Sequence, residues 1–155
     1  MTAHETPTTE SPGLPLGLDQ SDPDLVKSLL TGLAEVEDLL RSSAHSDVEF
    51  IDQAARHLVD AGGKRFRPLF TLLAAHVVDG PRPEVITAAA AVELVHMATL
   101  YHDDVMDEAT MRRGGASANA RWDNTIAILT GDFLFAHASM LVADLGPSAT
   151  RIIAE

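Results

Sequence analysis

Three aspartates and two arginines lie close together in one short stretch of the chain, ATLYHDDVMDEATMRRGG at residues 98–115. On a helix, Asp103 and Asp107 are one turn apart and share a face, with Asp104 beside them. Two carboxylates at this spacing repel each other unless a cation lies between them. Mg²⁺ selects carboxylate oxygens that leave positions open for water and phosphate. The spacing is therefore consistent with a magnesium site, and a helix end with solvated acids is the alternative.

The placement of these charges favours a functional interpretation. Carboxylates near the C-terminus of a helix oppose the helix dipole, so three of them there require a reason. Arg112 and Arg113 follow, just before Gly114 and Gly115. A turn at the glycines would fold the two guanidinium groups back over the metal, and arginine binds phosphate in a fixed bidentate geometry. A salt bridge to a local acid such as Glu108 is the competing explanation of the arginines.

A second group of basic residues lies upstream, in GGKRFRP at residues 62–68. Two glycines precede an expected helix start, and Lys64 and Arg67 share one face of that helix. Free backbone N–H groups at a helix start, together with lysine and arginine, form an anion site. The alternative is that the glycines only end the preceding helix and the basic side chains are solvated. Positive charge at a helix start again opposes the dipole, which favours function.

The elements that must position these residues are helices throughout. Apolar residues recur at helical spacing, and no convincing β-strand alternation is present. His96 and Thr99 then fall on the same face as Asp103. The expected helices cover residues 23 to about 40, 47–60, 64–78, 84–107, 119 or 123 to 143, and a last one from 148. The predicted fold class is all-α.

Composition limits the kind of protein. The chain has 155 residues, 46% of them apolar, which suits one domain with a real core. It has no cysteine, which fits a reducing cytoplasm, and a net charge of −12, which disfavours nucleic-acid binding. Residues 1–22 are rich in Pro, Thr, Ser and Gly and are expected to form a disordered tail, with 23–155 as the helical domain. We expect no transmembrane segment and no secretory signal, because acids interrupt the apolar stretches and no basic N-terminal region is present.

The chain resembles the trans-type polyprenyl diphosphate synthases of the polyprenyl synthetase family. Three segments carry the resemblance: GGKRFRP, ELVHMATLYHDDVMDEATMRRG and NARWDNTIAILTGDFLFAHAS. The resemblance implies an isoprenoid-synthase-type bundle of helices around a deep central cavity. It also implies Mg²⁺-dependent head-to-tail condensation of an allylic diphosphate with isopentenyl diphosphate, and a cytoplasmic homodimer.

By position, the resemblance implies a role for each polar residue named above. Asp103, Asp104 and Asp107 correspond to the first aspartate-rich motif, in which Asp103 and Asp107 hold Mg²⁺ that bridges the allylic diphosphate. Arg112 would contact that diphosphate. Four residues would hold the isopentenyl diphosphate: Lys64, Arg67, His96 and Arg113.

Two small residues, Ala98 and Thr99, precede Asp103 by five and four positions and are expected to set product length. In the family, bulky aromatic residues there would floor the cavity, and small ones resemble those of enzymes that make medium- and long-chain products. We therefore expect a product longer than farnesyl diphosphate, which Phe at either position in a complete enzyme would shorten. Tight helix packing is the alternative explanation of both small residues.

The family pattern is incomplete within residues 1–155. Members are longer and carry a second aspartate-rich motif on a later helix, so the chain matches an N-terminal half. We expect it to be a truncated portion that binds diphosphates weakly and does not turn over. A non-catalytic regulatory subunit is an alternative that the intact aspartates and arginines disfavour. A class I terpene cyclase is a third hypothesis, disfavoured because a cyclase has no isopentenyl diphosphate for GGKRFRP to hold.

Overall fold

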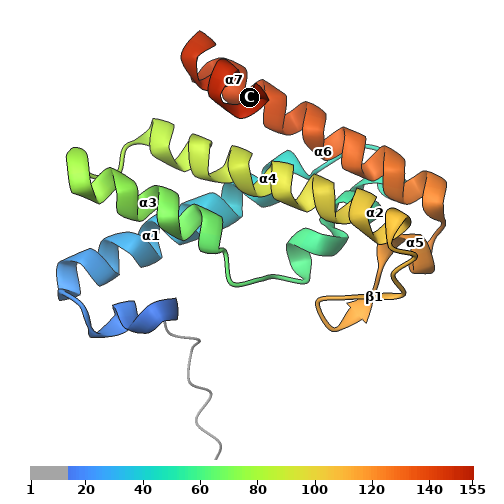
Figure 1. Cartoon of the computed structure of the whole chain (residues 1–155), viewed down its shortest axis with the longest axis horizontal. Helices are drawn as coiled ribbons and strands as arrows, with labels where there is room; N and C mark the ends of the chain where they lie inside the picture. Colours follow the sequence, from blue (N-terminus) through green and yellow to red (C-terminus); the bar gives the residue numbers. More distant parts are fainter. Residues whose placement is uncertain (1–13) are drawn as a thin grey trace, which may run out of the picture.

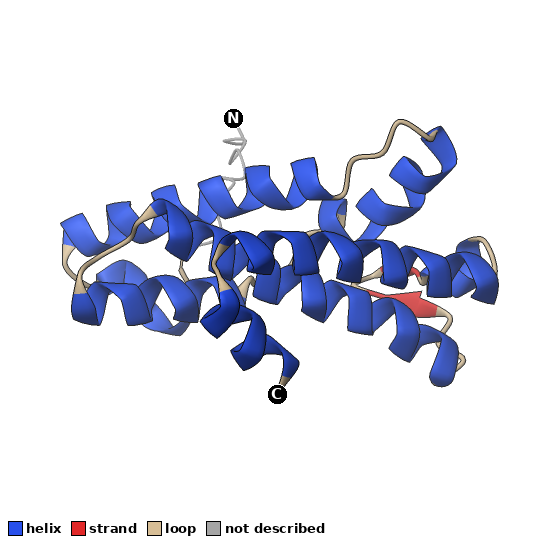
Figure 2. Ribbon diagram, turned by 90° about the horizontal axis from the view of Figure 1, so that it is seen from above, coloured by secondary structure: helices blue, strands red, loops and turns tan. Residues whose placement is uncertain are grey.

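The computed structural model of the chain describes residues 14–155, which form a bundle of helices (Figure 1). The helices are η1 (Pro15–Gln20, a 3₁₀-helix), α1 (Pro23–Ser43), α2 (Glu49–Asp60), α3 (Phe66–Val78), α4 (Pro83–Met106), α5 (Ala118–Arg121), α6 (Asn124–Asp144) and α7 (Pro147–Ala154). Two short strands, β1 (Met111–Arg112) and β2 (Gly115–Ala116), pair antiparallel at one end of the bundle, as Figure 2 shows. The predicted all-α class is confirmed.

Helix α4 lies at the centre of the bundle and packs against α1, α3 and α6. Small residues permit this close packing, since alanines 89–91 are buried on α4. At Gly131 of α6, an added Cβ would collide with the ring of His102 on α4, so the two helices approach too closely there for a side chain. Because Asp103 and Asp104 lie in the last turn of α4, the packing of this helix on several sides fixes the position of both residues.

The helix starts follow capping signals in the sequence. Asp22 accepts hydrogen bonds from the backbone N–H groups of Asp24 and Leu25 at 3.0 and 3.1 Å, and Pro23 occupies the first helical position. Asp123 caps α6 in the same way, accepting from the N–H of Ile126 at 2.8 Å. These two caps fix where the helices on either side of α4 begin.

The observed elements differ from the predicted ones in three places. Leu14 is buried and residues 15–20 form η1, within the range expected to be a disordered tail; residues 1–13 lie outside the described residues, and the extent of the tail stays a prediction. Strands β1 and β2 escaped prediction because two residues are too few to show alternation. The helix expected from residue 119 or 123 is two helices, α5 and α6, separated by Trp122 and Asp123.

Helices α4 and α6 are long and apolar enough to cross a membrane by length and composition alone. The core helices of water-exposed proteins have the same character, because they are apolar on several faces. The two helices pack against each other, and α4 carries two acids within the bundle, Glu93 and Asp104. Burial in the bundle thus accounts for the apolar character of α4, and the lack of a transmembrane segment stays a prediction.

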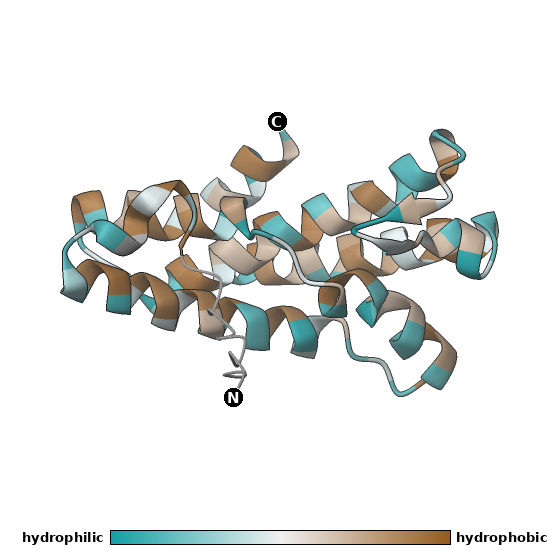
Figure 3. Cartoon of the chain, turned by 90° about the horizontal axis from the view of Figure 1, so that it is seen from below, coloured by the Kyte–Doolittle hydropathy of each residue, from teal (hydrophilic) through white to brown (hydrophobic). Residues whose placement is uncertain are grey.

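Some apolar residues also reach the surface. Figure 3 shows in brown where apolar residues, buried and exposed alike, lie on the helices. More than half of the side chain is exposed at Phe70 and Val77 of α3 and at Leu129 and Met140 of α6. An apolar groove of about 570 Å³ lies between α2 and α6 and is lined by Phe50 and Leu129, among others. Exposed apolar surface of this extent is typical of faces that contact another protein segment.

Candidate active site

The three aspartates at the end of α4 occupy different environments. Asp104 is fully buried and forms a salt bridge with Arg112, whose Nε and Nη2 lie 2.7 and 2.5 Å from Oδ1. The other carboxylate oxygen of Asp104 is buried without a hydrogen-bond partner among the described residues. Asp103 is partly exposed, Asp107 is exposed, and within residues 14–155 neither side chain enters a hydrogen bond or salt bridge. Asp103 and Asp107 are therefore free for a ligand, whereas Asp104 belongs to the fold.

A tight turn between β1 and β2 presents the two arginines. Its central residues, Arg113 and Gly114, both have positive φ, of 50° and 82°, as the favoured two-residue hairpin turns require. Asn119 and Ser117 fasten the hairpin to the end of α4, donating to the carbonyls of Asp104 and Ala109 at 3.1 and 2.6 Å. The partner of Arg112 is Asp104, so a local salt bridge does form, with an acid of the aspartate-rich stretch itself.

Arg113 points away from Arg112 and joins the two sequence motifs. Its Nη1 donates to the backbone carbonyl of Leu58 at 3.0 Å and to that of Gly62. Its guanidinium group packs on Gly63, where a Cβ would lie 3.3 Å from Cζ. Gly62 also ends α2 with a left-handed backbone, φ 70°. The two glycines therefore both end a helix and make room for Arg113.

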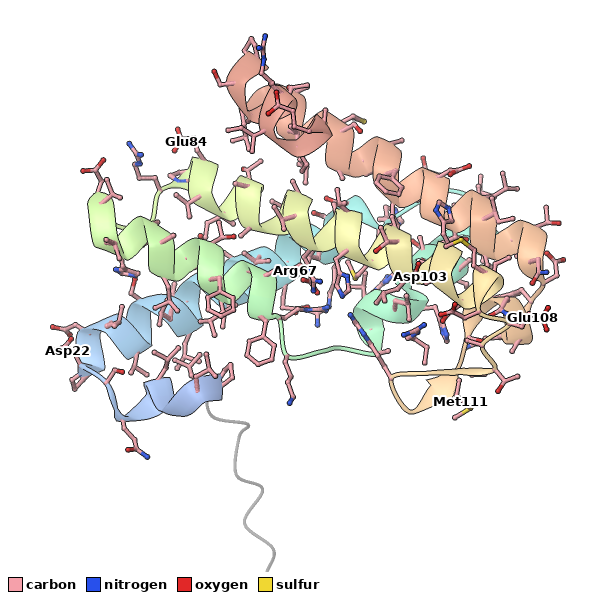
Figure 4. The ribbon with its side chains drawn as sticks, viewed as in Figure 1. Asp22, Arg67, Glu84, Asp103, Glu108 and Met111 are labelled. Carbon is pink, nitrogen blue, oxygen red and sulfur yellow. The ribbon has the colours of Figure 1, made fainter. Side chains whose placement is uncertain are left out.

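The three remaining predicted ligands lie around the same end of α3. Lys64 and Arg67 are exposed, and the Lys64 ammonium lies 5.9 Å from the ring centre of Phe66. Burial, together with the positive charges of Arg67 and Arg113, lowers the pKa of His96 to about 4. These charges act on His96 because both arginines lie near it. Figure 4 shows Arg67 and Asp103 toward the middle of the molecule, well away from Asp22 and Glu84 at the other end.

The low pKa of His96 predicts a pH effect on stability. The folded value of about 4 lies below the ordinary value of 6.5, so the unfolded chain takes up a proton first as the pH falls. His96 therefore has no effect above about pH 6.5 and lowers the free energy of unfolding progressively between about pH 6.5 and 4. We expect His96→Gln to lose less stability than the wild type across this window in urea unfolding. Equal losses in His96→Gln and the wild type would refute the assignment.

Ala98 and Thr99, the two residues expected to set product length, lie in different places. Ala98 is fully buried in the apolar core. Thr99 is partly exposed, and its hydroxyl donates to the carbonyl of His96 at 2.7 Å. The packing explanation thus has direct support at Ala98, and the product-length role is a proposal that fits Thr99 better.

Phe at the two positions should affect stability differently. Ala98→Phe is expected to lower the free energy of unfolding by about 1–3 kcal/mol, because a benzyl group overpacks a filled core. Thr99→Phe should cost less, since that side chain already reaches the surface. Denaturant unfolding of both variants measures the difference. Unchanged stability in Ala98→Phe would mean that Ala98 borders open space, as the product-length hypothesis requires.

Several buried residues at the site were not singled out in the sequence. Arg65 is 7% exposed, Glu93 is 2% exposed, and the two form a salt bridge with Nη1 and Oε1 3.1 Å apart. Tyr101 is fully buried and its hydroxyl donates to the carbonyl of Ala54 at 2.5 Å, which ties α4 to α2. Burial raises the pKa of Tyr101, so the hydroxyl stays protonated. A charged residue inside the apolar run of α4, Glu93, was the available signal.

The carboxylates at the end of α4 can supply only part of the ligand shell of a Mg²⁺ ion. Among residues 14–155, no three acids or histidines are arranged to surround a metal ion by themselves. Mg²⁺ is commonly held by one or two carboxylates and completes its shell with water and substrate phosphates. Asp103 and Asp107 offer that arrangement, next to a group of cations that suits a phosphate. The site is therefore suited to a metal that arrives with, or is shared with, an anionic ligand.

Comparison with known proteins shows to which family the chain belongs. The sequence profile described as polyprenyl synthetase matches residues 48–155. The chain belongs to the polyprenyl synthetase family. The nonaprenyl diphosphate synthase of Mycobacterium tuberculosis is 51% identical over 142 residues, which are 90% of this chain and 42% of that protein. Component 2 of the heptaprenyl diphosphate synthase of Geobacillus stearothermophilus is 44% identical over 79% of this chain and 39% of that protein.

Solved structures agree with this family assignment. The polyprenyl synthase from Caulobacter crescentus CB15, complexed with calcium and isoprenyl diphosphate, has a TM-score of 0.79 and 41% identity. The similarity covers 84% of this chain and 40% of that structure. The predicted isoprenoid-synthase fold is thus confirmed for the part that the chain spans. This polyprenyl synthetase family chain spans about two-fifths of the length of the relatives that it matches.

Proposed function

We propose that the protein contributes to a prenyltransferase reaction that condenses isopentenyl diphosphate with an allylic diphosphate to give a medium- or long-chain trans-polyprenyl diphosphate. One observation carries the proposal. Among the described residues Asp103 and Asp107 form no salt bridge, and the cations of the α2–α3 loop and the hairpin lie on the same part of the molecule. Relatives that make heptaprenyl and nonaprenyl diphosphates support the long product.

The residues have separate roles in this proposal. Asp103 and Asp107 hold Mg²⁺, which when bound neutralises the charge of the allylic diphosphate as it departs. Arg112 keeps Nη1 for the same diphosphate, because Asp104 engages only Nε and Nη2. Four side chains bind the isopentenyl diphosphate: Lys64, Arg67, His96 and Arg113. Since His96 is neutral at pH 7, it contributes a hydrogen bond rather than a charge.

The reaction follows from this placement of charges. The allylic C–O bond breaks and the diphosphate leaves with the electron pair, stabilised by positive charge around it. The alkene of isopentenyl diphosphate attacks the allylic cation and forms the new C–C bond. Loss of a proton from the resulting cation restores a double bond. Holding both diphosphates at adjacent sites supplies the proximity that this second step needs.

Residues 1–155 by themselves are expected to bind these substrates without turnover. Two carboxylates and the substrate phosphates hold one metal ion, whereas a departing diphosphate carries more charge than one ion offsets. The test is an assay with radiolabelled isopentenyl diphosphate, farnesyl diphosphate and Mg²⁺, followed by extraction of apolar products. Multiple turnovers by this chain would overturn the expectation of no turnover and support the catalytic proposal directly. Absence of substrate binding in the same preparation would refute the proposed function.

A role as a subunit of a larger synthase is the second candidate. One relative, at 44% identity, is named as a component of heptaprenyl diphosphate synthase, which favours assembly with another chain. Within residues 14–155 the side chains of Asp103 and Asp107 enter no hydrogen bond or salt bridge, which disfavours a purely structural subunit, since such a subunit has no use for two unpaired carboxylates one turn apart. Magnesium-dependent binding of diphosphate by the chain distinguishes the two, because a structural subunit binds none.

The exposed face of α6 supports assembly of two copies, and a cytoplasmic homodimer forms part of the proposal. Ile128, Leu129 and Met140 are exposed along α6. We expect sedimentation of the purified chain to give twice the monomer mass and Leu129→Glu to give a monomer, because a buried carboxylate would oppose the contact. Monomeric wild-type protein would contradict the homodimer.

A further inference from the structure

The middle cation of KRFR is used differently from its neighbours. Lys64 and Arg67 are exposed, whereas Arg65 is buried at the start of α3, in a left-handed backbone conformation with φ 47°. A non-glycine residue with positive φ is uncommon and is kept where the surroundings hold it. With this backbone conformation the Arg65 side chain points inward, whereas those of Lys64 and Arg67 remain exposed to solvent.

Every nitrogen of the Arg65 guanidinium group has a partner inside the protein. Its Nε and Nη2 donate to Glu37 of α1, the second at 3.2 Å, and Nη2 also donates to the carbonyl of Val59 of α2 at 3.1 Å. Its Nη1 donates to Glu93 of α4 at 3.1 Å and to the sulfur of Met97 of α4 at 3.9 Å. Arg65 therefore links α1, α2 and α4 to the start of α3, and it has no donor left for a diphosphate.

Glu93 lies between this buried arginine and an arginine of the site. Its Oε1 accepts from Arg65 at 3.1 Å and lies 4.0 Å from Nη2 of Arg113. Arg113 is held on its other side by the carbonyls of Leu58 and Gly62. Burial, followed by the positive charge of Arg65, lowers the pKa of Arg113, and the negative charge of Glu93 opposes this shift. One carboxylate thus separates two guanidinium groups that would otherwise repel each other in a poorly hydrated place.

We propose that Glu93, fixed by Arg65, is a positioning residue that holds Arg113 in place for isopentenyl diphosphate without touching the ligand itself. The inference rests on the proposed function, in which Arg113 binds that diphosphate. In this arrangement each of the two buried charged residues has a role: Arg65 fixes the position of Glu93, and Glu93 fixes that of Arg113.

Positioning and simple charge make opposite predictions for Glu93→Gln. Removing a negative charge 4.0 Å from Arg113 makes the site more positive, so charge alone predicts tighter binding of any anion. Positioning predicts weaker binding. Without the Glu93 carboxylate nothing offsets the repulsion between Arg113 and Arg65, so Arg113 moves out of place. We expect the affinity for isopentenyl diphosphate, measured by calorimetry, to fall about tenfold, as for the loss of one charge-assisted hydrogen bond.

Glu37→Gln is the matched control, because Glu37 also pairs with Arg65 but does not approach Arg113. We expect the affinity of Glu37→Gln for isopentenyl diphosphate to stay within about threefold of the wild type, a change in binding free energy smaller than the contribution of one hydrogen bond. Glu93→Asp keeps the charge and shortens the side chain. Positioning therefore predicts weaker binding in this variant too, whereas charge alone predicts no change in affinity. That variant supplies the test if Glu93→Gln does not fold by circular dichroism.

A measurement without ligand separates failure of this inference from failure of the proposed function. The Arg113 side chain is 18% exposed, so phenylglyoxal should modify it slowly in the wild type. We expect modification at Arg113, located by tandem mass spectrometry, to become severalfold faster in Glu93→Gln and to stay slow in Glu37→Gln. Unchanged reactivity in Glu93→Gln, or affinity that rises in that variant, overturns the inference. A wild type that binds no isopentenyl diphosphate overturns the proposed function instead, whatever the reactivity of Arg113.

Discussion

Asp103→Asn is expected to abolish metal-dependent binding of an allylic diphosphate while leaving the fold intact. Asp103 is partly exposed and enters no hydrogen bond or salt bridge with its side chain within residues 14–155. Its loss removes one of the two carboxylates proposed to hold Mg²⁺, so the affinity in the presence of Mg²⁺ should fall by about 100-fold or more, given that even outer-shell changes at metal sites cost about 10–100-fold. Isothermal titration with farnesyl diphosphate and Mg²⁺ measures this.

Two controls make the result specific. Asp144→Asn removes the same charge from an exposed position at the end of α6, and its affinity should equal that of the wild type. Thermal unfolding of Asp103→Asn should match the wild type, because no buried contact is lost. If Asp103→Asn binds farnesyl diphosphate as tightly as Asp144→Asn does, the metal assignment at the end of α4 is wrong.

Arg112→Met is expected to have the largest effect on stability. It leaves the fully buried carboxylate of Asp104 without its partner, and breaking a buried ion pair from one side costs about 3–5 kcal/mol. For a chain of this size, the midpoint of thermal unfolding should fall by roughly 10 °C. Arg41→Met, which loses only exposed ion pairs of 3.8 to 4.0 Å, should change stability by under about 1 kcal/mol.

A double variant shows whether the effect comes from the pair itself. Asp104→Asn with Arg112→Met removes both charges, and replacing a whole buried pair is often close to neutral. The double variant should therefore recover most of the stability that Arg112→Met loses. Unfolding curves for Arg112→Met that overlay those for Arg41→Met would mean that the Asp104–Arg112 pair does not stabilise the fold.

Most of the helices could be predicted from apolar residues that repeat at helical spacing and from capping residues. Asp22 and Pro23 marked the start of α1, and the apolar runs of α4 and α6 marked the two long central helices. A turn at the glycines was expected, but strands β1 and β2 could not be predicted, because two strands of two residues leave no pattern. Ser117 and Asn119, which follow the hairpin, donate to the carbonyls of Ala109 and Asp104 and hold it at the end of α4.

The candidate site residues could be named from the sequence, but which of them are buried in the fold and which are available to a ligand could not. Asp103 and Asp104 are adjacent and chemically alike, yet one is available to a ligand and the other is buried against Arg112. Arg65 was passed over between Lys64 and Arg67 for the same reason. Which of two neighbours points inward depends on partners in α1, α2 and the hairpin, and the residue pattern around each position does not show these partners.

The central claim is that the exposed carboxylates of α4 and the cations beside them form one metal-dependent diphosphate site. Titration of farnesyl diphosphate into the chain, with Mg²⁺ and then with excess EDTA, tests it most directly. We expect saturable binding with Mg²⁺ and an affinity lower by about 100-fold with EDTA, since the two carboxylates would then repel the diphosphate. Equal affinity in both titrations, or no binding in either, would contradict the claim.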